Sequence, residues 1–185
     1  METDEYLFSL FCSGNEHGLH ELMERYGDKL TLYINGYIHD ITESEDLMIE
    51  AFSRISFKKP TFNENGFKSY LYKTGRNLAL RHCVKQRQRN HFYIDELKNE
   101  PQAKQIVEDI ACESELECVL KLSMEQINPD YKEALYLIYI EGMSYAEASH
   151  IMKKNEKQIA NLVFRGKNAL KPILQKEGII SNAKY

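Results

Sequence analysis

Apolar side chains recur along this chain at the three- and four-residue intervals of α-helices, and this periodicity is the strongest constraint on its fold. The series are Leu19, Leu22, Met23, Tyr26 and Leu30; Leu47, Ala51, Phe52 and Ile55; and Ala134, Leu135 and Ile138. Positions three and four apart share one face of a helix, so each series predicts a buried stripe. No pattern typical of strands accompanies them. The sequence therefore predicts an all-α protein.

Short polar sequences mark where several of these helices are expected to begin. "SGNE" (13–16), "TESE" (42–45) and "SYAE" (144–147) each place Ser or Thr three residues before Glu, which is the pattern of a capping box. Asn128 precedes Pro129, a cap followed by a proline at the first helical position. Asn155 is expected to cap another helix, with Gln158 reaching back to it.

The segment from 90 to 113 interrupts the helical pattern with polar and acidic residues and Pro101. We therefore expect two small helical domains, residues 1–90 and 114–185, joined by an acidic linker at 91–113.

Charge is distributed unevenly along the chain. The formal net charge of -4 is the balance of 24 basic and 28 acidic side chains. Residues 67–89 carry seven basic and no acidic side chains, and residues 142–185 carry eight basic and three acidic ones. Two basic segments in an acidic chain predict two separate surfaces for an anionic partner.

The helical patterns at 144–152 and from 156 to about 172 have the size and spacing of a helix-turn-helix. The buried stripe of the second helix is expected to contain Ile159, Leu162, Val163, Gly166 and Leu170. The side chains expected to point away from it are Gln158, Asn161, Phe164 and Arg165. Gln and Asn can pair with adenine, and Arg with guanine or phosphate, so this set can read a major groove. A solvated amphipathic helix explains the pattern equally well.

The basic segment 67–89 is expected to form a helix that turns Phe67, Leu71, Leu78 and His82 toward a core. The side chains left for its other faces are Lys68, Tyr72, Lys73, Arg76, Asn77, Arg81 and Lys85. Aromatic rings stack on unpaired bases while cations follow phosphates, so this set suits single-stranded nucleic acid. A merely solvated face is the alternative, although such faces normally alternate Lys with Glu.

A turn-rich loop, "KKPTFNENG" at residues 58–66, precedes the basic helix. Its Phe62, Asn63 and Asn65 could hold one base extruded from a stack. A plain surface turn is the simpler explanation of the same residues.

Signals for other functional classes are weak. His17 and His20 lack a third ligand at metal-binding spacing, and no nucleophile motif is present, so we expect no catalysis, metal or cofactor. The four cysteines lack paired spacing, which predicts reduced thiols. The apolar runs are much shorter than a membrane span and "METDE" lacks the charge of a signal peptide, which predicts a cytoplasmic protein without a membrane partner.

Several of these segments, in this order, resemble the small extracytoplasmic-function sigma factors of bacterial RNA polymerase, within the sigma-70 family. They are "DITESEDLMIEAFSRI" (40–55), "FKSYLYKTGRNLAL" (67–80), "EGMSYAEASHIM" (141–152) and "IANLVFRGKNAL" (159–170). Such factors contain only sigma regions 2 and 4. The resemblance implies a protein that binds core RNA polymerase and directs promoter recognition, DNA opening and transcription initiation.

The resemblance also implies roles for individual residues. The residues expected to dock on the largest polymerase subunit are Glu45, Asp46, Ile49, Glu50 and Arg54. The loop at 58–66 would catch a flipped base of the downstream promoter element. Tyr72, Arg76, Asn77 and Arg81 would line the separated strand, and Asn161, Phe164 and Arg165 would meet the upstream element. An anti-sigma factor is a further partner of such proteins, and we expect a monomer.

Five positions depart from the family pattern. The family usually has Gly in the turn where Lys153 stands, and commonly a basic residue at Ala160 and Leu162. It has Gln at Ile49 and Trp at Tyr70. The absent glycine predicts another backbone path through the turn, and the absent cations predict weaker or more selective upstream binding.

Three other functions stay open at this point. The first is a stand-alone helix-turn-helix regulator, which would need to dimerise to match two half-sites. The second is a sequestering protein that keeps the fold without reading DNA, and the last is a metal-dependent enzyme.

Overall fold

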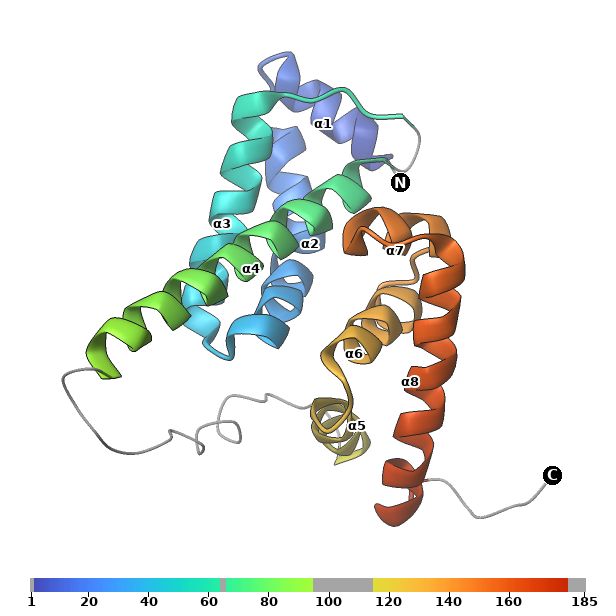
Figure 1. Ribbon diagram of the computed structural model, residues 1–185. Coiled ribbons are helices and arrows are strands. Elements are labelled where there is room, and N and C mark those ends of the chain that lie inside the picture. Colours follow the sequence, from blue (N-terminus) through green and yellow to red (C-terminus); the bar gives the residue numbers. More distant parts are fainter. Residues whose placement is uncertain (1, 64–65, 95–114, 180–185) are drawn as a thin grey trace. The chain divides into compact units, whose positions relative to one another are not determined.

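The computed structural model describes residues 2–63, 66–94 and 115–179, and all regular structure in these ranges is helical (Figure 1). The chain divides into two compact units, residues 1–106 and 107–185. The expectation of an all-α protein is confirmed. None of the described helices is long and apolar enough to cross a membrane.

The first unit contains four helices, α1 (Asp4–Cys12), α2 (His17–Ile38), α3 (Ile41–Lys58) and α4 (Gly66–Ile94). Helix α2 packs against the other three, and α4 crosses it and continues beyond it (Figure 1). The buried apolar side chains that hold these helices together include Leu7, Leu22, Leu30, Ile34, Phe52, Ile55, Phe67 and Leu71. We expected the first domain to end at residue 90, but α4 continues to Ile94. The domain boundaries at residues 90 and 114 remain a prediction.

Two of the expected helix starts in the first unit are wrong. Ser13 is the C-cap of α1, and α2 follows Glu16 without a side-chain cap at that residue. Helix α3 begins after Asp40, whose Oδ1 accepts from the backbone N–H of Glu43 at 3.0 Å. An aspartate two residues earlier caps the helix in place of the expected threonine, so the start moves by two residues.

The second unit contains α5 (Glu115–Glu125), α6 (Pro129–Leu135), η1 (Tyr136–Ile140), α7 (Tyr145–Met152) and α8 (Glu156–Lys176). Helix α8 packs against α5, α6 and α7. The expected caps are confirmed: Asn128 caps α6 with Pro129 in its first turn, and complete capping boxes begin α7 and α8. The core of this unit includes Ala134, Leu137, Ala148, Ile151, Ile159 and Val163.

A five-residue π-helix, η1, replaces the continuous α-helix that the apolar spacing predicts after Leu135. The backbone N–H of Glu141 donates to the carbonyl of Tyr136 at 3.0 Å, which is the five-residue step of a π-turn. Tyr139 and Ile140 are both 55% exposed at the end of this turn.

Two cysteines, Cys12 and Cys83, carry free thiols, whereas Cys118 is disulfide-bonded. The expectation of reduced thiols is therefore wrong for Cys118.

Candidate nucleic-acid interface

The turn of the helix-turn-helix is formed by Lys153 in the left-handed conformation, with φ 55° and ψ 44°. The next residue, Lys154, donates its backbone N–H to the carbonyl of Ser149 at 3.1 Å and pairs its Nζ with Asp130 Oδ2 at 3.2 Å. The expectation that the turn follows another backbone path is therefore wrong. Lysine takes the conformation that glycine would adopt more easily, because the flanking helices fix it there.

Helix α8 has the two faces that its sequence predicts. Ile159, Val163 and Gly166 are buried, and Leu162 and Leu170 are partly buried. A Cβ on Gly166 would lie 3.0 Å from Leu135 Cδ1, so glycine allows α6 and α8 to approach closely. The opposite face exposes Gln158, Asn161, Phe164 and Arg165, and Phe164 is 67% exposed.

Gln158, one of these exposed residues, also takes part in the N-terminal capping box of α8. The Oε1 atom of Gln158 accepts from the backbone N–H of Asn155 at 2.9 Å, and Asn155 Oδ1 accepts from the N–H of Gln158 at 2.8 Å. Gln158 therefore helps to begin α8, and this capping contact competes with any contact that its amide oxygen makes with a base.

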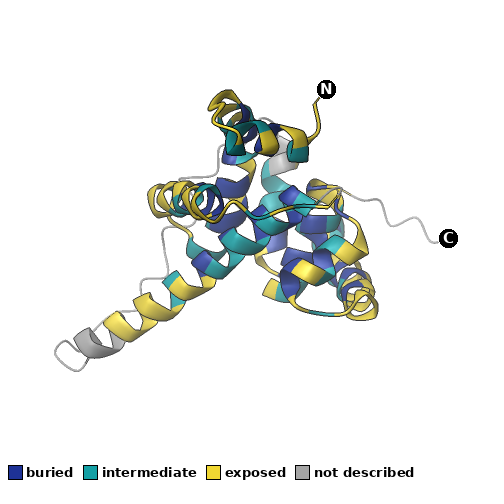
Figure 2. Ribbon diagram, turned by 90° about the horizontal axis from the view of Figure 1, so that it is seen from above, coloured by how far each residue is buried: buried dark blue, intermediate teal, exposed yellow. Residues whose placement is uncertain are grey.

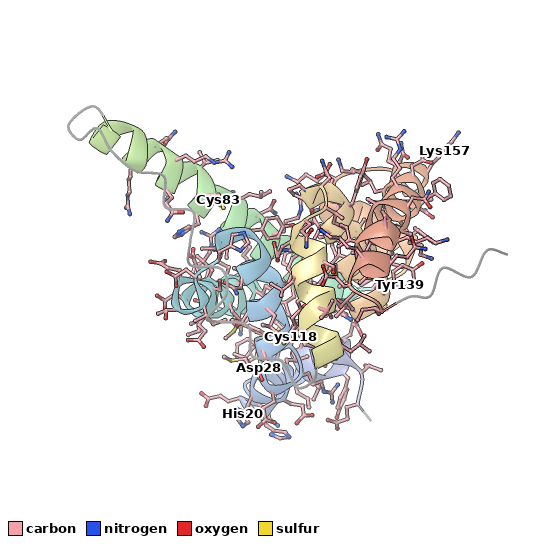
Figure 3. All side chains as sticks on the ribbon, turned by 90° about the horizontal axis from the view of Figure 1, so that it is seen from below. His20, Asp28, Cys83, Cys118, Tyr139 and Lys157 are labelled. Atoms are coloured by element: carbon pink, nitrogen blue, oxygen red, sulfur yellow. The ribbon has the colours of Figure 1, made fainter. Side chains whose placement is uncertain are left out.

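Two further residues on the exposed face of α8 were not predicted from the sequence. Lys157 lies one turn before Asn161 and is labelled at the outer surface of the second unit in Figure 3. Asn168 lies one turn after Phe164 and is also exposed. The same helical spacing that defined the exposed set could have found both residues.

Helix α4 does not expose all of the residues predicted for its nucleic-acid face. Lys68, Lys73, Arg76 and Asn77 are partly buried, and Arg81 is exposed. Tyr72 is fully buried, with its ring centre 5.2 Å from that of Tyr33, so its predicted place on the exposed face is wrong. The buried stripe of α4 is wider than predicted because α2 packs against α4, and Tyr33 of α2 contacts the ring of Tyr72.

The later turns of α4 carry the exposed cations. Arg81, Lys85, Arg87 and Arg89 are exposed, and Figure 2 shows the change from buried to exposed along this helix. Nitrogen-tipped side chains surround its ribbon near Cys83 in Figure 3. His82 is partly buried, as expected, and its Nδ1 lies 3.8 Å from Glu43 Oε2.

The loop before α4 is anchored by an aromatic cluster. The ring of Phe62 lies 5.2 Å from Phe8, 5.5 Å from Phe67 and 5.4 Å from Tyr70, measured between ring centres. Phe62 is therefore partly covered, whereas Asn63 is exposed and its carbonyl accepts from the N–H of Gly66 at 2.9 Å. Asn65 lies outside the described residues. Base capture by this loop stays a prediction.

Helix α3 presents the surface expected to dock on polymerase. Glu45, Asp46 and Ile49 are exposed, and Glu50 pairs its Oε1 with Arg54 Nη2 at 2.6 Å. Two turns further along, Phe57 is 91% exposed. The exposure of Phe57 could not be predicted from the sequence, because a lone aromatic residue near the end of a helix can be buried or exposed.

The histidines weighed as metal ligands have another arrangement. His20 Nε2 lies 3.4 Å from Glu24 Oε1 on the surface of α2. Within the described ranges, no group of three or more His, Cys, Asp or Glu side chains could hold a metal ion.

The geometry defines a class of helical protein with two candidate DNA-binding surfaces. One is the helix-turn-helix of the second unit, and the other is the cationic helix of the first unit. Comparison with known families makes this class specific. Residues 22–89 match the family profile described as Sigma-70 region 2, and residues 119–170 match the one described as Sigma-70, region 4. The chain therefore belongs to the sigma-70 family of RNA polymerase sigma factors.

Individual relatives agree with this assignment. The chain is 28% identical over 164 residues to the ECF RNA polymerase sigma factor BldN of Streptomyces coelicolor, covering 88% of this chain and 62% of that relative's length. It is 26% identical to the ECF RNA polymerase sigma factor SigM of Bacillus subtilis, over 83% of this chain and 93% of the relative.

Two solved structures share the fold. The sigma factor RpoE of Bartonella quintana, in complex with the anti-sigma factor NepR, has a TM-score of 0.63 and 21% identity, covering 84% of this chain and 96% of that one. CnrH in complex with the cytosolic domain of CnrY has a TM-score of 0.66 and 18% identity, covering 95% of this chain and 99% of that one.

Proposed function

We propose that this protein binds core RNA polymerase, selects promoters and helps to open them, with no chemistry of its own. The observation that carries this proposal is the pairing of regions 2 and 4 in one chain, each with an exposed cationic helix. A stand-alone regulator needs a helix-turn-helix but has no use for region 2. The family comparisons therefore favour the sigma factor.

Helix α8 is the proposed reader of the upstream promoter element. Asn161 and Arg165 are one turn apart on its exposed face and have the donors that recognise adenine and guanine in a major groove. Phe164 beside them offers an apolar contact for a thymine methyl group. The ring of Phe164 is exposed in the free protein, and we propose that DNA covers it in the bound state.

Helix α4 is the proposed holder of the separated strand. Arg76 and Asn77 lie where the helix leaves the core, and Arg81 and Lys85 continue the cationic surface onto its exposed turns. Opening DNA requires roughly 1.4 kcal/mol per stacked step, so a few phosphate and base contacts can shift a nearly balanced equilibrium. Asn63 is an exposed residue of the described part of the loop and is the proposed contact for one captured base.

Helix α3 is the proposed docking surface for core polymerase. Glu45 and Asp46 place negative charge at its first turns, beside the exposed Ile49. A partner with basic residues around an apolar spot would match this surface, because complementary charge guides association while the apolar contact stabilises it.

Further parts of the proposal follow from the family and the relatives. The two structural neighbours were solved with an anti-sigma factor or with a cytosolic partner domain, and we propose an anti-sigma factor as a partner of this chain too. We also propose that the protein acts in the cytoplasm as a monomer until it joins polymerase. The acidic segment 91–113 is the proposed linker between the DNA-binding parts.

Association with core polymerase tests the proposal. The full chain, labelled with a fluorophore, is titrated with bacterial core polymerase, and its anisotropy is expected to report a 1:1 complex. The double variant Glu45→Arg, Asp46→Arg is expected to weaken that complex at least tenfold, because like charges then face the partner. Glu24→Arg on α2 is the matched control and is expected to bind normally. A wild-type chain that never joins core polymerase contradicts the proposal.

A further inference from the structure

Helix α1 lies before the segment that matches region 2, which begins at residue 22. It nevertheless contacts the loop and the first turn of α4, where we propose that the separated strand is held. These contacts join parts of the chain that are far apart in sequence, and they suggest what α1 contributes beyond filling the core.

The carboxylate of Glu5 on α1 caps the beginning of α4. The backbone N–H of Phe67, the second residue of α4, donates to Glu5 Oε1 at 3.2 Å. The first N–H groups of a helix have no acceptor within it, and a negative charge there also complements the helix dipole. The first turn of α4 contains no acidic residue of its own. Helix α1 therefore supplies the charge that α4 lacks.

The same helix holds the described part of the loop. The ring of Phe8 lies 5.2 Å from Phe62 and 5.5 Å from Phe67, and the ammonium group of Lys59 lies 5.5 Å from the ring of Phe11. Two loop residues and the beginning of α4 are thus fixed to one short helix. Asn63, which is exposed for base capture, directly follows Phe62.

Helix α1 is itself fastened firmly to α2. Asp4 pairs its Oδ1 with Arg25 Nη1 at 3.2 Å and accepts a hydrogen bond from the hydroxyl of Tyr26. A Cβ on Gly18 would lie 2.1 Å from the carbonyl oxygen of Leu7, so only glycine allows the two helices to approach this closely. Because these contacts hold α1 in place on α2, the contacts that α1 makes fix the positions of the loop and of the first turn of α4.

We propose that α1 positions the strand-holding surface and that Glu5 is its main positioning residue. This inference rests on the proposed function, because it concerns how the same surface holds an unpaired strand. Loss of the Glu5 carboxylate leaves the first turn of α4 without its cap. The backbone around Asn63 and the first turn of α4 then unfold locally more often. The acidic surface proposed to dock on polymerase lies on α3, a different helix from that of Glu5, so binding to core polymerase is expected to be unaffected.

Two measurements test this on the full chain. The first is amide exchange of Phe67, followed by NMR in the free protein, which Glu5→Ala is expected to accelerate about fivefold. The second is promoter opening by the complex with core polymerase, on a duplex selected by the wild-type complex from a random pool. Permanganate reactivity of unpaired thymines is expected to fall about fivefold. Glu5→Gln keeps an acceptor without the charge and is expected to be intermediate in both.

The control is Glu24→Ala, which removes an exposed glutamate from α2 and is expected to behave as wild type. Unchanged exchange at Phe67 in Glu5→Ala overturns the inference whatever the DNA does. Equal losses of opening and of core binding also overturn it, because they indicate general unfolding. A wild-type complex that opens no DNA contradicts the proposed function, whereas wild-type opening that survives in Glu5→Ala contradicts only the positioning role.

Discussion

The ring of Tyr72 on α4 packs 5.2 Å from the ring of Tyr33 on α2, and both side chains are buried. This pair belongs to the core of the first unit and not to its proposed DNA-binding surface. Truncating a buried aromatic side chain typically destabilises a domain by about 3–5 kcal/mol. Tyr72→Ala is therefore expected to lower the free energy of unfolding of the first unit by that amount, measured by urea denaturation. Tyr6→Ala, at an exposed tyrosine, is the matched control and should change it by less than about 0.5 kcal/mol. A Tyr72→Ala variant with the same free energy of unfolding as the wild type contradicts the assignment of Tyr72 to the core.

Lys153 is the position where a single substitution should stabilise the second unit. Its left-handed conformation, with φ 55°, is unfavourable for residues that have a Cβ. Lys153→Gly is expected to raise the free energy of opening of α7 and α8 by about 0.5–1 kcal/mol, measured by native-state hydrogen exchange. Ala160→Gly, in the regular part of α8, should lower it by about 1 kcal/mol. Destabilisation by Lys153→Gly would mean that the turn does not bear this strain.

Asn161 and Arg165 are expected to determine affinity for the upstream element. Each lies on the exposed face of α8 and supports little of the fold, so substitution should act on DNA binding alone. Asn161→Ala and Arg165→Ala should each weaken binding of the polymerase complex to a selected promoter about tenfold, measured by filter binding. Lys176→Ala, at the end of α8, serves as the control. Normal affinity in both interface variants would show that another surface reads this element.

The exposed cations of α4 should appear in the salt dependence of strand binding. Each phosphate contact to a single strand contributes about 0.7 to the slope of log affinity against log salt concentration. The triple variant Arg81→Gln, Lys85→Gln, Arg89→Gln is therefore expected to reduce that slope by about 2, measured with a DNA bubble that lacks the upstream element. Lys176→Gln should leave the slope unchanged. If the triple variant also keeps the wild-type slope, α4 does not follow the phosphates.

The sequence was sufficient to predict several local features and insufficient for contacts between distant segments. The capping boxes at Ser144 and Asn155 and the two faces of α8 depend on spacings within a few residues, and all of these were correct. The burial of Tyr72 was missed because it depends on packing against another helix, α2, whose Tyr33 contacts its ring. The cap that Glu5 gives to Phe67 joins residues 62 positions apart, and no local pattern indicates it.

The helix-turn-helix shows a second limit of sequence patterns. The unusual Lys153 suggested a different turn, but the flanking helices impose the left-handed conformation on whichever residue stands there. The π-turn at Tyr136–Ile140 was missed for a similar reason, since its apolar residues fit an α-helix equally well.

In vitro transcription by core polymerase with this protein tests the central claim most directly. The claim is that cationic helices in two units hold one promoter while the polymerase performs the synthesis. The wild-type chain is expected to direct initiation at a defined start on a selected promoter. Asn77→Ala and Arg165→Ala should each lose start-site selection while still binding core polymerase. Initiation that is indifferent to both substitutions, or a wild-type chain that gives core polymerase no defined start, would contradict the account.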